Sequence, residues 1–183
     1  MIHLPAWQYI TFPQAPAQLL LEIEQFCKFG CPWIQLRMKN TSNDVILATA
    51  FKAKEICEAY NTRLSINDHV NIAQQVKADG IHLGKNDLSV VEARKIVGKH
   101  MIIGATANSF KDIEKLAMQE LQYIGLGPFA FTKTKSNLSP ILGLQGYQAI
   151  STKMKENNIE IPVYAVGGIE LSDISSIFDT GVH

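Results

Sequence analysis

The sequence predicts an α/β protein, specifically a (β/α)₈ TIM barrel in which the last strand and helix are missing from the chain. Short apolar runs rich in β-branched and aromatic residues alternate with amphipathic helical patterns, and the pair recurs roughly every 25 residues. The chain has 183 residues, of which 46% are hydrophobic and 19% are charged, which suits one good core. We therefore expect a single domain over residues 1–183 in which helical crossovers join parallel strands.

Each expected strand is a short apolar run, and each expected helix follows one of these runs. We expect strands at residues 7–11, 33–37, 64–66, 80–83, 101–104, 122–127 and 161–166. We expect helices at residues 17–29, from the capping segment 41–44 to about residue 60, and at 70–77, 89–97, 109–121, 143–155 and 172–179. Gly30 is a plausible stop for the first helix, and Ser89 with Glu92 forms a capping box at the start of the fourth.

The end of the chain is the feature that a complete barrel does not explain. A barrel needs an eighth strand and helix, and the sequence stops at residues 180–183, where that strand would begin. Either the sequence is truncated or the barrel stays open. A doubly wound sheet is the alternative fold, but it usually has a Gly-rich turn after its first strand, where this chain has Thr-Phe-Pro-Gln at residues 11–14.

Charge and composition exclude several classes of protein. Seventeen basic residues balance seventeen acidic ones, which argues against a nucleic-acid binder that works by bulk charge. We expect no signal peptide, because residues 1–5 lack a basic region and a long apolar run, and no run approaches the ~20 apolar residues of a membrane span. The three cysteines, Cys27, Cys31 and Cys57, are expected to be reduced thiols of a cytoplasmic protein. The expected partners are small molecules, and assembly into a homo-oligomer is left open.

Polar residues at the expected strand ends indicate the chemistry, because the carboxyl ends of barrel strands meet at one rim. Arg37, Lys39 and Lys135 could surround a polyphosphate. Asp68 and Asp87, with the amide of Asn67, could hold Mg²⁺, which uses one or two carboxylates plus phosphate oxygens. Together these residues suggest a metal-bound diphosphate as substrate.

Two later segments also indicate phosphate binding. Thr132-Lys-Thr-Lys135 places two hydroxyls and two ammonium groups at the end of an apolar strand, which suits an oxyanion. Gly167-Gly168, between a strand and a helix, could offer backbone N–H groups to a phosphate.

Several of these residues also have an ordinary structural interpretation. Arg37 and Lys39 could be solvated charges on an edge strand, although a parallel barrel has no exposed edge. Asp68 could cap the following helix, Asp87 could be a turn residue, and Gly167-Gly168 could be only a turn. His82 is expected to be a core histidine.

With these residues in hand, the sequence resembles the thiamine-phosphate synthases, also called thiamine-phosphate pyrophosphorylases. The matching motifs run in the family's order over almost the whole chain. They are Gln35-Leu-Arg-Met-Lys39, Ile66-Asn-Asp68, Asp79-Gly-Ile-His-Leu-Gly84 with Asp87, Tyr123-Ile-Gly-Leu-Gly-Pro128 leading to Thr132-Lys-Thr-Lys135, and Pro162-Val-Tyr-Ala-Val-Gly-Gly-Ile169. The family joins 4-amino-2-methyl-5-hydroxymethylpyrimidine diphosphate to a thiazole phosphate, giving thiamine phosphate and diphosphate.

The resemblance implies a role for each matching residue. The pyrimidine diphosphate is expected to be held by Gln35, Arg37, Lys39, Asn67 and Lys135, and the metal Mg²⁺ by Asp68 and Asp87. The thiazole phosphate is expected at Thr132 and Thr134 with the backbone at Gly143 and Gly168. Thr106 stands where the family usually has a serine that contacts the pyrimidine. The residues expected to act in catalysis are Arg37, Lys39, Thr106 and Lys135.

Three departures from the family pattern qualify the resemblance. Met38 replaces a common glutamate, Lys85 replaces a usual glutamine, and the missing last unit normally supplies backbone donors to the thiazole phosphate. A thiazole tautomerase of the same superfamily is the alternative enzyme, although such relatives tend to carry a histidine where this chain has Asn108. A barrel that binds phosphate ligands without turnover is the third reading.

Overall fold

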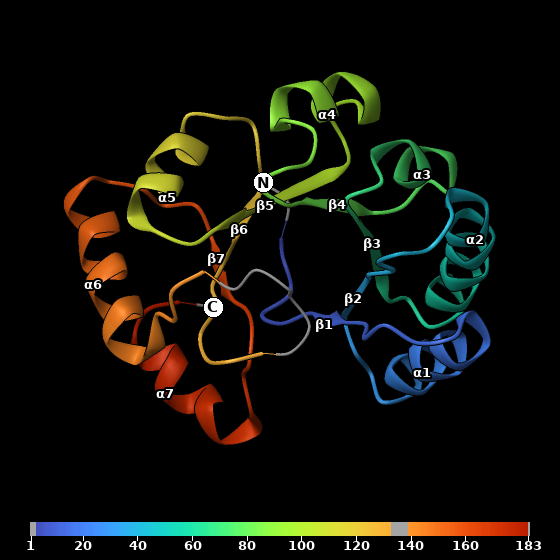
Figure 1. Ribbon diagram of the computed structural model, residues 1–183, viewed down its shortest axis with the longest axis horizontal. Coiled ribbons are helices and arrows are strands. Elements are labelled where there is room, and N and C mark those ends of the chain that lie inside the picture. The colour runs from blue at the N-terminus through green and yellow to red at the C-terminus, as the bar shows by residue number, and fades with distance from the viewer. Residues whose placement is uncertain (1–2, 133–138, 183) are drawn as a thin grey trace. The chain divides into compact units, whose positions relative to one another are not determined.

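The computed structural model describes residues 3–132 and 139–182, in which strands and helices alternate (Figure 1). The chain divides into two compact units, Met1–Ile103 and Gly104–His183, with the boundary inside one strand. The predicted single domain over 1–183 stays a prediction. Each unit is described by itself below.

The first unit is a parallel sheet with helices between its strands. Its strands pair in chain order, in the order β1, β2, β3 and β4. The elements are β1 (Tyr9–Ile10), α1 (Pro16–Lys28), β2 (Trp33–Leu36), α2 (Asn43–Ala59), β3 (Arg63–Asn67), α3 (Val70–Gln75), β4 (Gly80–Leu83) and α4 (Val90–Val97). Helices α1, α2 and α3 lie on the outer side of these strands in Figure 1. A helix connects each strand of this unit to the next one in the chain.

The core of the first unit explains why these segments are strands. Every residue of β2 and of β4 is buried, as expected for parallel strands with both faces covered. The helix α1 buries Leu19, Ile23 and Cys27, which share one face at a spacing of four residues. Trp33 of β2 is fully buried, and its Nε1 donates a 2.8 Å hydrogen bond to Ser65 Oγ of β3.

The second unit repeats the pattern with three strands. β5 (Ile102–Ala107), β6 (Tyr123–Leu126) and β7 (Val163–Ala165) are parallel neighbours in chain order. The helices are α5 (Phe110–Ala117), α6 (Gly143–Glu156) and α7 (Ile174–Asp179), which follows the 3₁₀ turn η1 (Leu171–Asp173). Gly104 is required by close packing, because a Cβ atom there would lie 2.0 Å from the Tyr123 ring.

Several predicted boundaries need correction. β5 runs to Ala107 instead of ending at 104, so Thr106 lies within a strand and pairs in register with Gly125. The helix predicted to reach residue 121 ends at Ala117, and the last helix is divided into η1 and α7. The capping box at Ser89 and Glu92 is present, and the stop at Gly30 is confirmed by its positive φ of 78°.

Candidate active site

Near the end of β2, hydrogen bonds to residues on either side of β1 hold the side chain of Gln35 and the backbone of Arg37. Gln35 is buried, and its Nε2 donates a 2.5 Å hydrogen bond to Oε1 of Gln8. The backbone N–H of Arg37 donates to Thr11 Oγ1 at 2.9 Å, and that hydroxyl donates to the Arg37 carbonyl at 3.4 Å. The strand pairing between β1 and β2 is thus extended by a side chain up to Arg37.

The Arg37 guanidinium is half-buried, and its surroundings act on it in two ways. Burial lowers the pKa of Arg37, while the nearby Asp68 carboxylate acts in the opposite direction. Arginine keeps its charge even so, because its ordinary pKa is above 12. A partly dehydrated guanidinium attracts a phosphate more strongly than one in bulk water.

Asp68 follows β3 and carries an ion pair on its side chain. Lys39 Nζ donates to Asp68 Oδ2, and the two side chains are 44% and 14% exposed. The Asp68 backbone has a φ of 67° and its N–H donates to the His82 carbonyl at 2.9 Å. The alternative that Asp68 caps the next helix is wrong, because the N-cap of α3 is His69 and no side chain caps it.

Asp87 lies beside Asp68 and closes a turn with Gly84. Its Oδ2 accepts a 2.7 Å hydrogen bond from the Gly84 backbone N–H. Burial is the main cause that raises the pKa of Asp87, and a hydrogen bond and charge repulsion from Asp68 raise it further. The turn interpretation of Asp87 is therefore correct, and the turn also delivers its carboxyl group to Asp68.

The two carboxyl groups and their surroundings fit a small divalent cation. A Cβ atom on Gly84 would lie 2.7 Å from Asp87 Oδ2 and 3.9 Å from Asp68 Oδ1, so only glycine leaves this space open. Residues 3–132 and 139–182 contain no group of three or more His, Cys, Asp or Glu side chains that could hold a metal. Side chains of these types would therefore supply at most two ligands here. Two carboxylates match Mg²⁺, which takes its remaining ligands from water and phosphate.

Asn67 and His82 line the same strand ends and are both buried. They are register partners across β3 and β4. Burial agrees with the prediction that His82 belongs to the core.

In the second unit, the loops after β6 and β7 are bound to each other. Phe129 N–H donates to the Val166 carbonyl at 3.0 Å, and Ala130 N–H donates to the Gly167 carbonyl at 2.9 Å. Gly168 has a φ of 71°, and a Cβ atom there would lie 2.6 Å from the Phe131 carbonyl oxygen. Glycine is required at 168 for both reasons.

The remaining predicted residues of this unit are placed only in part. Gly143 begins α6 with a φ of 57°, and its N–H donates to the Phe129 carbonyl at 3.0 Å. Thr132 is partly exposed at the edge of the described chain. Thr134 and Lys135 lie outside the described residues.

Asn108, which bears on the tautomerase alternative, links the ends of β5 and β6. Its Nδ2 donates to the Gly127 carbonyl, and its backbone N–H donates to Asp112 Oδ2 at 3.0 Å. The amide therefore serves local structure at the place where the alternative expects a histidine.

Sequence reasoning did not identify Gln8, Thr11 or Gly84 as contributors to this site. Gln8 carries a weak signal, because an amide interrupts an otherwise apolar and aromatic strand. Thr11 and Gly84 carry none in the sequence alone, since their roles depend on residues 26 and 3 positions away.

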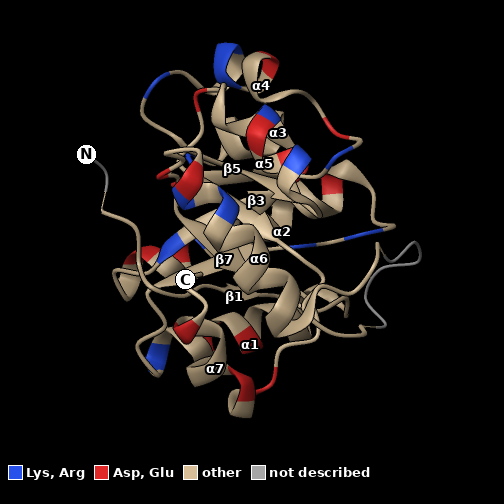
Figure 2. Ribbon diagram, turned by 90° about the vertical axis from the view of Figure 1, so that its left-hand side faces the viewer, with Lys and Arg blue, Asp and Glu red and all other residues tan. Residues whose placement is uncertain are grey.

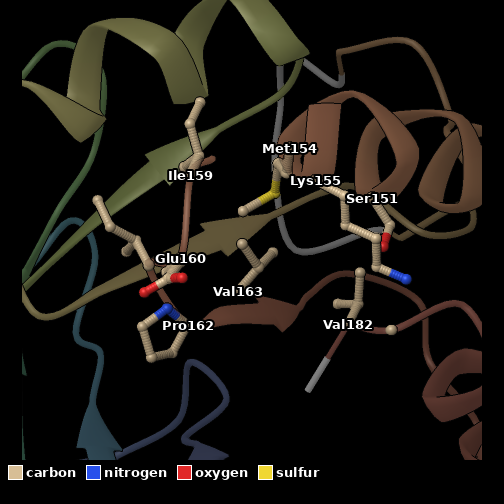
Figure 3. A pocket seen from close by; sticks show the side chains of 10 residues that line it. Ser151, Met154, Lys155, Ile159, Glu160, Pro162, Val163 and Val182 are labelled. Atoms are coloured by element: carbon tan, nitrogen blue, oxygen red, sulfur yellow. The ribbon is translucent and has the colours of Figure 1, made fainter. Parts of the chain in front are cut away.

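A cavity of about 190 Å³ lies in the second unit, next to the amino end of β7 (Figure 3). Met154 and Lys155 of α6, Val163 at the start of β7, and Val182 line it. Ligand sites in parallel α/β folds lie at the carboxyl ends of strands, whereas this cavity adjoins the amino end of β7. It is therefore separate from the predicted phosphate loops.

The distribution of charge agrees with small-molecule chemistry. Basic and acidic residues are interspersed in Figure 2, and both signs occur within α4 at Glu92, Arg94 and Lys95.

The three cysteines are buried free thiols, as predicted. None of the helices in the described residues is both long and apolar enough to cross a membrane.

Comparisons with known proteins agree with these motifs. Residues 8–183 match the family model described as thiamine monophosphate synthase. The chain is 48% identical to the thiamine-phosphate synthase of Flavobacterium johnsoniae over 176 residues, which cover 96% of this chain and 83% of that protein. It is 50% identical to the thiamine-phosphate synthase of Phocaeicola vulgatus over 153 residues, which cover 84% of this chain and 74% of that protein.

The fold also matches a solved structure. The thiamine phosphate pyrophosphorylase from Pyrococcus furiosus superposes with a TM-score of 0.79 and 24% identity, over 96% of this chain and 81% of that one. This likeness confirms the α/β fold of alternating parallel strands and helices. By its sequence matches over nearly the whole length, the chain belongs to the thiamine monophosphate synthase family.

Proposed function

We propose that this protein is a Mg²⁺-dependent thiamine-phosphate synthase. As a transferase of thiamine biosynthesis, it joins 4-amino-2-methyl-5-hydroxymethylpyrimidine diphosphate to a thiazole phosphate and releases diphosphate. Membership of the family supports the reaction. The structural observation that carries the proposal is the pair of carboxyl groups, Asp68 and Asp87, with the Lys39 ammonium beside them.

In the proposal, Asp68 and Asp87 would hold Mg²⁺, an ion that characteristically binds one or two carboxylates together with phosphate oxygens. The bound ion would neutralise negative charge that develops on the leaving diphosphate. Burial, and after it the neighbouring Asp68 carboxyl group, raises the pKa of Asp87, so having both groups ionised is unfavourable here. Because a bound cation would relieve the repulsion between the two carboxylates, the pair is suited to bind one.

The side chains that directly follow β2 supply the positive charge that the diphosphate requires. Arg37 can bind phosphate oxygens through two parallel N–H groups, and Lys39 adds a mobile point charge. Lys135, although outside the described residues, is assigned to the same diphosphate on its motif. Electrostatic stabilisation of the leaving group is then the main catalytic contribution of the protein.

The pyrimidine ring is assigned to Gln35, Asn67 and Thr106. All three bear polar side chains on strands, where a rigid scaffold fixes their positions. The aminopyrimidine can stabilise the cation left when diphosphate departs, and the thiazole nitrogen captures that cation. No protein nucleophile takes part, so positioning of both substrates is the second contribution.

The thiazole phosphate is assigned to Thr132, Thr134 and the backbone at Gly143 and Gly168. The bonded loops after β6 and β7 support this, because glycine at 168 lets the backbone approach closely. The (β/α)₈ barrel is part of the proposal, since it would bring all the strand ends to one rim. The buried free thiols suit the reducing cytoplasm, where we place the enzyme.

One assay tests the function. The protein is incubated with both phosphorylated substrates, with Mg²⁺ or with excess chelator, and thiamine phosphate is followed with time. We expect product only with Mg²⁺, loss of product in Asp87→Asn, and wild-type rates in the exposed carboxylate control Asp44→Asn. Absence of product from the wild type, alongside measurable binding of thiazole phosphate, would contradict the synthase assignment and favour the non-catalytic barrel.

A further inference from the structure

The residue directly before β1 is a glutamine, Gln8, whose side chain is hydrogen-bonded to a residue of the proposed pyrimidine site. Gln8 Oε1 accepts the 2.5 Å hydrogen bond from Gln35 Nε2. The strand register pairs Ile10 with Gln35, and Gln8 lies two residues before Ile10, just ahead of β1. Through this bond, a residue outside the family motifs touches one of the expected substrate-binding side chains.

The other end of the Gln8 amide is unusual. Its Nε2 is buried, and within the described part of the chain it has no hydrogen-bond partner. A buried donor without an acceptor is unfavourable, and folded proteins retain few of them. An apolar side chain of similar size would avoid this cost, so stability alone does not account for glutamine at this position.

The bond to Gln8 determines which chemical group Gln35 can present. The two ends of a primary amide have nearly the same shape but opposite hydrogen-bonding character. With Gln35 Nε2 directed at Gln8 Oε1, rotation of the Gln35 amide alone by half a turn would lose the bond, and the Gln8 amide would have to turn with it to restore one. In this arrangement Gln35 Nε2 is used by Gln8, and the Gln35 oxygen is the end that can accept a hydrogen bond from a ligand.

We propose that Gln8 is a positioning residue that fixes the amide of Gln35, so that its oxygen accepts a hydrogen bond from the exocyclic amine of the pyrimidine substrate. This inference rests on the proposed function, which supplies an aminopyrimidine as ligand. Gln8 acts through Gln35 and is not a catalytic residue. Its expected effect is on recognition of the pyrimidine diphosphate and not on the thiazole phosphate.

The test compares Gln8→Met with wild type. We expect a rise of about tenfold in KM and in the calorimetric Kd for the pyrimidine diphosphate, the size of one lost hydrogen bond. kcat and the KM for thiazole phosphate should change less than about threefold. Gln14→Met is the matched control, because Gln14 Nε2 also makes one side-chain hydrogen bond, to Glu22 at 2.7 Å, in the same part of the chain.

A double-mutant cycle separates positioning from a general structural role. If Gln8 acts only through Gln35, Gln8→Met should not weaken pyrimidine diphosphate binding further in a Gln35→Met background. Gln8→Glu keeps an oxygen acceptor for Gln35 and should remain closer to wild type than Gln8→Met. An equal loss of affinity in both backgrounds, or no change in Gln8→Met, would overturn the proposal.

The pyrimidine diphosphate that lacks the exocyclic amine gives an independent measurement. It should bind wild type and Gln8→Met with equal affinity, and a preserved tenfold difference would contradict the assigned contact. Calorimetry needs no turnover, so a wild type that binds the pyrimidine diphosphate without forming thiamine phosphate would overturn the function and still decide the role of Gln8. A wild type that does not bind it would overturn both.

Discussion

Replacing Gly84 by alanine should damage the carboxylate pair without disturbing the backbone. Gly84 does not have a positive φ, so alanine can adopt its conformation. The added Cβ would lie 2.7 Å from Asp87 Oδ2, closer than such contacts occur, while its next neighbours are 3.7 Å away or more. The carboxylate of Asp87 is therefore the group that must move.

The size of the movement sets the size of the effect. To reach an ordinary contact of 3.4 Å, Asp87 Oδ2 must retreat by about 0.7 Å from its position 2.7 Å from that Cβ. Such a retreat lengthens and weakens its hydrogen bond to the Gly84 N–H, which now measures 2.7 Å. Loss of a hydrogen bond to a charged group costs about 1.5–3 kcal/mol. We therefore expect Mg²⁺ to bind roughly 10- to 100-fold more weakly.

The assay is the Mg²⁺ concentration that gives half-maximal formation of thiamine phosphate in Gly84→Ala. The control is Gly98→Ala, where a Cβ atom meets nothing within 4 Å but the positive φ of 74° strains the backbone. The control should lower the melting temperature and leave the Mg²⁺ requirement unchanged. A wild-type Mg²⁺ requirement in Gly84→Ala would refute the assignment of Asp87 to the metal.

Three further outcomes are expected. Because the pKa of Asp87 is raised in the folded state, its contribution to stability is full below the ordinary carboxyl pKa and is lost as the pH rises through the raised value. Asp87→Asn should therefore raise the melting temperature of the metal-free protein at pH 7, with a smaller difference in acid. Lys39→Met should strengthen Mg²⁺ binding to the free protein by roughly two- to fivefold and weaken pyrimidine diphosphate binding, both measured by calorimetry. Trp33→Phe, which loses the bond to Ser65, should lower the free energy of unfolding in urea by about 2–3 kcal/mol, whereas exposed Trp7→Phe should not.

The alternation of strands and helices could be predicted because buried strands and amphipathic helices leave local patterns. β4 was predicted at its observed bounds, since its apolar run begins at a glycine and ends before a polar turn. α5 was predicted too long because helical periodicity continues beyond Ala117, where the chain turns instead. β5 was predicted too short because Thr106 and Ala107 gain their strand character from pairing with Gly125 and Leu126. Such pairing is not encoded locally.

The candidate site, too, could be predicted only in part from the sequence. Asp68 and Asp87 could be placed together from sequence, because parallel strands bring their carboxyl ends to one edge. The contacts of Thr11 with Arg37 and of Gln8 with Gln35 could not, since each joins residues about 26 positions apart through side-chain geometry. The resemblance supplied the residues that meet substrate. The structure added the residues that hold them in place.

The ion pair between Lys39 and Asp68 links the binding of Mg²⁺ to the binding of the diphosphate in the proposed site. In the metal-free protein, the Lys39 ammonium offsets part of the repulsion between Asp68 and Asp87. A cation bound by the carboxylates competes with that ammonium for Asp68, and the ammonium that it releases is available to the diphosphate. Each ligand therefore favours the other, and linkage requires the effect to be reciprocal. Lys39→Met should abolish this part of the coupling, so Mg²⁺ should improve diphosphate binding less in the variant than in wild type.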